Sequence, residues 1–166
     1  MVANFTIMST FSYMMPVWGG TEEYTIKAAQ VLQNKAARII TKLSWFTPQR
    51  ILLQQTIWLS IRQMIEYHTI LQVLRTRRSK KPKYLEKKFN REYTYQTRGV
   101  VAGVSVMEGY LRVPEMNTAL GNSGMMVKGP TMWNSMPREF RLFSGSIASF
   151  KKDLKIWIRT RSNGET

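Results

Sequence analysis

The side chains in this sequence that could do chemistry are its cations, because 25 Lys and Arg stand against ten Asp and Glu and give a net charge of +15. The densest group lies between residues 75 and 91, where Glu86 is the only acid. We predict a binding set there of Arg75, Arg77, Arg78, Lys80, Lys81, Lys83, Lys87 and Lys88. Such a charge favours a polyanionic partner, since neutralising phosphates releases condensed counterions. A solvated basic loop and a nuclear-import signal are the alternatives.

A second group of cations lies earlier in the chain, on an expected helix that also carries Lys27. At about 100° per residue, Lys35, Arg38 and Lys42 share roughly one side of that helix. A helical face of this kind suits a nucleic-acid backbone, because phosphate contacts hold a duplex without reading its bases. The alternative is the solvated outer face of an ordinary bundle helix.

Aromatic residues follow or interrupt the basic region at 75–91. They are Tyr84, Phe89, Tyr93 and Tyr95. Aromatic rings among cations can stack on unpaired bases. The alternative, which we favour, is that these rings anchor the basic segment onto a helical bundle.

Groups that could hold a catalytic metal are scarce. Asp153 is the only aspartate, His68 is the only histidine, and the chain has no cysteine. Enzymes that join or cut nucleotides commonly hold two metal ions with clustered carboxylates, and zinc sites need several His or Cys ligands. The sequence therefore predicts no catalytic residue, no metal site and no cofactor. It favours a protein that holds nucleic acid without cutting or extending it.

The first twenty residues carry no charged side chain, which raises the question of an export or membrane segment. Several polar residues and Pro16 interrupt this stretch, so it is poorly suited to span a bilayer or to act as a signal peptide. We predict instead a buried amphipathic segment at 1–20 and no membrane partner. Its apolar set is Phe5, Met8, Phe11, Met14 and Met15. The lack of cysteine is consistent with an intracellular location, nuclear or cytoplasmic.

Helical patterns position the cations in the first half of the chain. Thr21 is a plausible N-cap for a first helix, Pro48 suits the start of a short second one, and Ser60 with Gln63 forms a capping box for a third. The apolar stripe expected on the first helix is Ala28, Leu32, Ala36, Ile39 and Leu43. That of the third is Ile61, Met64, Ile65, His68, Leu71 and Leu74. These helices should pack as a three-helix bundle at 21–78.

The pattern changes after residue 78. Pro82 prevents one continuous helix, so we predict a basic linker at 79–92. A C-terminal extension at 93–166 should hold short strands near 93–97 and 110–113, glycine-rich loops and a terminal helix. The sequence thus predicts a mainly α fold with a small α+β C-terminal part, in which a helical bundle precedes short strands and a C-terminal helix.

Six short motifs occur in an order that is more specific than any one of them. They are PVWGG at 16–20, LQNKAARII at 32–40, WLSIRQ at 58–63, KYL at 83–85, GPTMWNSMP at 129–137 and SFKKDLK at 149–155. From about residue 11 to 158, this series resembles the region downstream of the polymerase palm in non-LTR (LINE-type, jockey-like) retrotransposon reverse transcriptases. Met136 stands where that family commonly has Leu.

The resemblance implies the thumb and C-terminal region of an RNA-directed DNA polymerase, with 1–20 as the end of the palm-like region. The family's catalytic Tyr/Phe-x-Asp-Asp turn lies upstream of the matching part and does not occur here. We therefore expect a noncatalytic fragment that contacts the backbone of an RNA/DNA hybrid or duplex, with the palm and fingers of a parent polymerase as a further partner. The alternatives are a stand-alone basic RNA- or DNA-binding module and a nonfunctional remnant of the element.

Overall fold

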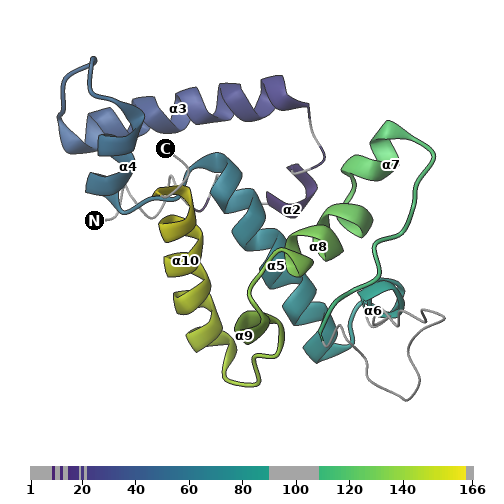
Figure 1. Ribbon diagram of the computed structural model, residues 1–166. Coiled ribbons are helices and arrows are strands. Elements are labelled where there is room, and N and C mark those ends of the chain that lie inside the picture. The colour runs from purple at the N-terminus through teal and green to yellow at the C-terminus, as the bar shows by residue number, and fades with distance from the viewer. Residues whose placement is uncertain are drawn as a thin grey trace.

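The computed structural model describes Ser9, Ser12 and residues 15–18, 20, 22–89 and 109–163. Its helices are α2 (Met15–Trp18), α3 (Glu23–Thr41), α4 (Gln49–Thr56), α5 (Ile61–Ser79), α6 (Lys83–Phe89), α7 (Ala119–Ser123), α8 (Met125–Asn134), α9 (Arg138–Arg141) and α10 (Ile147–Asn163) (Figure 1). The described part is mainly helical, as predicted.

Helix α5 lies at the centre of the fold, and α2, α3, α6, α8 and α10 pack against it (Figure 1). The predicted capping box begins this helix. The backbone N–H of Gln63 donates to Ser60 Oγ at 3.3 Å, and the backbone N–H of Ser60 donates to Gln63 Oε1 at 2.9 Å. Because neighbours surround α5, its buried side chains are not confined to one stripe. They are Ile61, Met64, Ile65, Thr69, Ile70, Leu71, Val73, Leu74 and Thr76.

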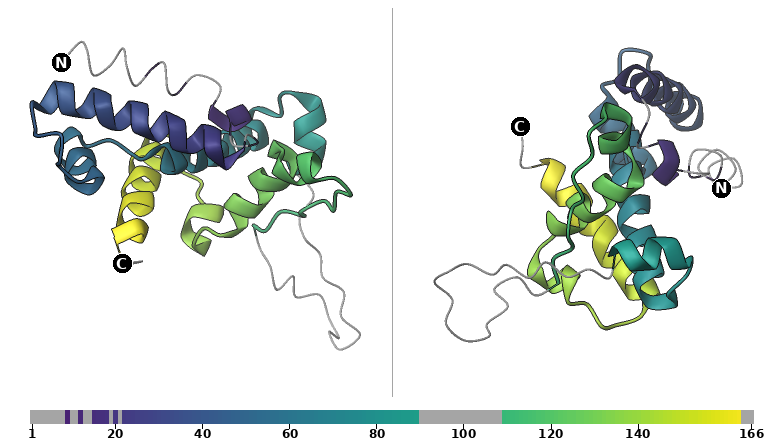
Figure 2. Two further views of the ribbon diagram at one scale, coloured as in Figure 1. Left: turned by 90° about the horizontal axis from the view of Figure 1, so that it is seen from above. Right: turned by 90° about the vertical axis from the view of Figure 1, so that its right-hand side faces the viewer.

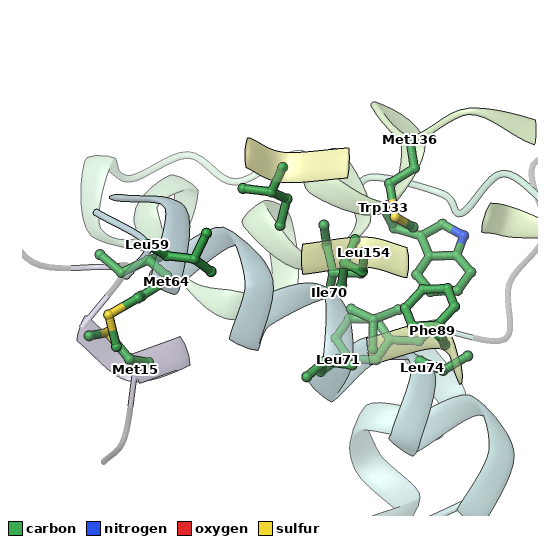
Figure 3. Packing of buried hydrophobic residues seen from close by; sticks show 14 of the residues in the cluster. Met15, Leu59, Met64, Ile70, Leu71, Leu74, Phe89, Trp133, Met136 and Leu154 are labelled. Atoms are coloured by element: carbon green, nitrogen blue, oxygen red, sulfur yellow. The ribbon is translucent and has the colours of Figure 1, made fainter. Parts of the chain in front are cut away.

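The C-terminal helices share this core, so residues 109–163 do not form a separate extension. Trp133 and Met136 from the α8 region and Phe150 and Leu154 from α10 are buried in the same cluster as Ile70 and its neighbours (Figure 3). Met15 of α2 is also buried there, as predicted, while the other members of the expected apolar set lie outside the described residues.

The expected strand at 110–113 is not observed: the described residues contain no strand, and this segment has only an isolated β-bridge residue, Leu111. Its backbone is paired by a side chain: the Leu111 amide donates to Asn134 Oδ1, and Asn134 Nδ2 donates to the Leu111 carbonyl, each at 2.8 Å. Trp133 Nε1 also donates to the Gly109 carbonyl at 2.9 Å. The Asn134 side chain thus pairs both backbone groups of Leu111. The candidate strand at 93–97 lies outside the described residues.

The predicted linker at 79–92 is partly helical, because α6 forms between Lys83 and Phe89. Leu85 and Phe89 are its buried side chains and fix it to the core. The chain does break near Pro82, where the sequence predicted an interruption between two helices.

The buried face of α3 was predicted only in part: Ala36 and Leu43 of the expected stripe are partly buried beside α4, but the fully buried residues are others. The buried side chains of α3 are Ala29, Gln33 and Ala37, whereas the predicted core residues Leu32 and Ile39 are 58% and 78% exposed. Gln33 Nε2 donates to the Leu59 carbonyl at 2.8 Å. This bond satisfies a fully buried amide, so a polar side chain sets the orientation of the helix.

The small cluster between α3 and α4 tests this orientation. Ala37 packs there with Leu52 and Trp58 and is fully buried, whereas Ala28 is exposed. We expect Ala37→Leu to cost about 1–3 kcal/mol through overpacking and Ala28→Leu to stay within about 0.5 kcal/mol of the wild type. Urea unfolding followed by circular dichroism measures both. Equal losses in the two variants would contradict the observed helix orientation.

Candidate nucleic-acid interface

Six of the predicted cations form an exposed group where α5 turns into α6. We call it the α5–α6 basic surface; its members are Arg75, Lys80, Lys81, Lys83, Lys87 and Lys88. The turn that joins the two helices is held by local bonds. The Lys80 amide, in a left-handed C-cap, donates to the Thr76 carbonyl at 2.9 Å, and the Lys81 amide donates to Ser79 Oγ at 3.3 Å. The cations therefore sit on helices and a bonded turn that the core supports.

Two other predicted residues in this region bind the protein itself. The Arg77 guanidinium lies over the Trp133 ring, 5.2 Å from its centroid, and Arg77 is half-buried. Arg78 donates to the Phe143 carbonyl at 3.1 Å and lies 5.8 Å from the Phe143 ring centroid. Both arginines brace the C-terminal half of the chain against α5, so we assign them a structural role ahead of a binding one.

Local electrostatics explains part of this concentration of charge. Cations near the end of α5 face the partial negative charge of its terminal carbonyl groups, a favourable arrangement. Arg75 also acts on His68 of the same helix. Burial lowers the pKa of His68 first, and the charges of Arg75 and of Lys151 on α10 lower it further. Burial raises the pKa of Tyr67, and Arg75 acts in the opposite direction. Lys87 and Lys88 stand in the same relation to the last turn of α6, whereas Lys83 lies at the beginning of that helix.

The structure does not bring the second predicted group to this surface. The C-terminal end of α3 and the α5–α6 turn lie at opposite ends of the described fold in every view (Figures 1 and 2). Lys35 and Lys42 are exposed, but Arg38 is half-buried and donates to the Thr47 carbonyl at 3.2 Å. The cations thus form two separate groups and not one continuous strip.

The aromatic residues near the basic region have mixed positions. Phe89 is fully buried, so it anchors α6 as predicted, whereas Tyr84 is exposed; Tyr93 and Tyr95 lie outside the described residues. Sequence reasoning missed another aromatic pair. Trp45 and Phe46, in the loop between α3 and α4, are 65% and 91% exposed. The signal that could have identified them is their place in a helix break flanked by cations.

Within the described residues, no three His, Cys, Asp or Glu side chains lie close enough to hold a metal ion. No described helix is both long enough and apolar enough to cross a bilayer. Comparison with known protein families, curated protein sequences and solved structures gives no match. The resemblance to a known group of proteins therefore rests on the sequence motifs alone.

Proposed function

We propose that this chain binds a nucleic-acid duplex by its sugar–phosphate backbone through the α5–α6 basic surface. The supporting observation is that six exposed cations lie along the last turns of α5, the α5–α6 turn and α6, a helix that buried Leu85 and Phe89 fix to the core. Lysine side chains placed this way contact phosphates without reading bases. The net charge of +15 adds a long-range attraction for the same partner.

The motif series narrows the proposal to a fragment of a LINE-type retrotransposon reverse transcriptase. In that interpretation, the chain is the thumb and C-terminal region, its ligand is an RNA/DNA hybrid or duplex, and synthesis belongs to a palm that this sequence lacks. The chain is then not an enzyme on its own, and it acts inside the cell, in the nucleus or cytoplasm. A primer-extension assay with Mg²⁺ should give no product.

The outer face of α3 favours a second candidate role, as a docking surface for the palm or fingers of a parent polymerase. Four large apolar side chains are exposed there: Tyr24, Val31, Leu32 and Ile39. Exposed apolar side chains grouped on one helix often mark a protein interaction site. A chain that has lost this partner would be a nonfunctional remnant that self-associates, whereas a stand-alone module would stay monomeric on sedimentation.

The test of the main proposal is salt-dependent binding of a labelled RNA/DNA hybrid, followed by fluorescence anisotropy. If the six exposed cations contact about six phosphates, the logarithm of the binding constant should fall with the logarithm of salt with a slope of about −5. Titration of a DNA duplex of equal length shows whether the chain prefers the RNA/DNA hybrid or the DNA duplex. A flat salt response would exclude backbone contacts as the source of binding.

A further inference from the structure

We propose that the loop between α3 and α4 is a stacking site for unpaired bases of single-stranded nucleic acid. The inference extends the proposed function, on which it rests for the class of ligand, to the opposite end of the fold from the α5–α6 basic surface (Figure 1). The two residues that would stack are Trp45 and Phe46, which we call the aromatic turn.

The aromatic turn is held in place by the residues around it. The Thr47 amide donates to the Ser44 carbonyl at 3.0 Å, and the Phe46 amide contacts Ser44 Oγ at 3.4 Å. From α3, Arg38 donates to the Thr47 carbonyl and places its guanidinium 5.1 Å from the centroid of the Trp45 ring. The loop and the indole are therefore fixed to the helix before any ligand arrives, which lowers the entropic cost of binding.

Arg38 holds the Trp45 ring, but neither ring of the aromatic turn is buried. Most of the surface of Trp45 and nearly all of Phe46 face solvent. Large aromatic side chains usually bury most of their area, because each one removes a large apolar surface from water. The small core beside the loop, formed by Ala37, Leu52 and Trp58, does not include them. Two exposed aromatic side chains on neighbouring residues of a hydrogen-bonded turn are typical of a surface that binds a flat or apolar partner.

The charge around the aromatic turn favours nucleic acid over an apolar protein partner. No Asp or Glu occurs between Glu23 and Glu66. Lys35, Lys42 and Arg50, which belong to the α3–α4 region, are exposed. A strand whose bases stack on the turn would therefore meet cations and no acidic side chain from the segment between Glu23 and Glu66. Aromatic platforms flanked by cations are the usual means of holding unpaired strands.

A duplex does not fit this site, because its bases are already stacked on one another and only strand ends present a free ring face. The ligand class is thus single-stranded RNA or DNA. Stacking needs only the flat face of a base, so little sequence preference is expected. Duplex binding at α5–α6 and single-strand binding at α3–α4 are separate activities that different substitutions should remove.

The experiment compares a labelled oligo(dT) with an abasic oligodeoxynucleotide of equal length, which carries the same charge but no bases. The wild-type chain should bind oligo(dT) about tenfold more tightly, a ratio typical of aromatic–base stacking. Trp45→Ala with Phe46→Ala should abolish this ratio while leaving abasic and duplex binding unchanged. Leu120→Ala, which removes an 80% exposed apolar side chain from α7, is the matched control and should keep the ratio.

The outcomes separate this inference from the proposed function. Equal wild-type binding of the two oligonucleotides, with normal salt-dependent duplex binding, overturns base stacking and leaves the proposed function standing. Equal weakening of every ligand by the double variant also overturns it, because the turn would then act on folding or on net binding. Self-association that the double variant removes, without any preference for oligo(dT), would identify the turn as an interface between copies. A circular dichroism melt of each variant confirms that it is folded.

Discussion

Replacing Lys80, Lys81 and Lys83 together with Ala should weaken binding of an RNA/DNA hybrid by up to about a hundredfold at low salt and reduce the salt slope by about 2–3. Each lysine that neutralises a phosphate contributes about 0.9 to that slope. All three side chains are exposed, so the free energy of unfolding should change by less than about 0.5 kcal/mol for each substitution. Anisotropy titrations at several salt concentrations measure both quantities.

The matched control removes the same number of charges from other places. Lys27 on α3 and Lys152 and Lys155 on α10 are exposed and lie outside the α5–α6 basic surface. If Lys27→Ala, Lys152→Ala and Lys155→Ala together reduce the slope as much as the first variant does, net charge governs binding. The α5–α6 surface would then have no special role, and the proposed function would lose its site.

Local signals in the sequence predicted the parts of the fold that local interactions determine. The capping box at Ser60 and Gln63 needs only residues three positions apart, and it forms as expected. The break near Pro82 follows from a ring that cannot continue a helix, whatever surrounds it. Burial of Met15 followed from its place among apolar neighbours.

The buried face of α3 could not be predicted from local signals, because it depends on hydrogen bonds to residues that are distant in the sequence. By hydropathy, Leu32 and Ile39 rank far above Gln33, yet Gln33 is the buried residue. Its partner, the Leu59 carbonyl, lies 26 residues away, and the neighbouring Gln30 Oε1 accepts the Ile61 amide at 2.9 Å. A hydrogen-bonding requirement at the start of α5 thus outweighs the burial of two aliphatic side chains.

The candidate interface was likewise predictable from the sequence only in part. Composition identified the basic region, but it could not indicate which cations are committed to internal contacts. Arg77 and Arg78 are committed by contacts with Trp133 and Phe143, which lie more than 50 residues later in the chain. The strand expected at 110–113 failed for a related reason, since the Asn134 side chain pairs with the Leu111 backbone.

The largest loss of stability is expected for Trp133→Ala. Trp133 is buried beside the Phe89 end of the core (Figure 3), and it carries the Arg77 guanidinium on its ring. The substitution leaves a large cavity, which costs about 3–5 kcal/mol. It also leaves the Gly109 carbonyl without its hydrogen-bond donor, which adds about 1 kcal/mol or more. Urea unfolding at 25 °C measures the total.

A loss of this size approaches the whole stability of many small domains, about 5–15 kcal/mol. Trp133→Ala should therefore be largely unfolded near body temperature. Trp133→Phe, which keeps part of the ring and loses the bond to Gly109, should fall between it and the wild type. Trp45→Ala removes the same side chain from an exposed loop and should cost less than about 1 kcal/mol. Similar losses for Trp133→Ala and Trp45→Ala would mean that α8 does not close the core over α5, and the α5–α6 basic surface would then lack the support that holds its cations in place.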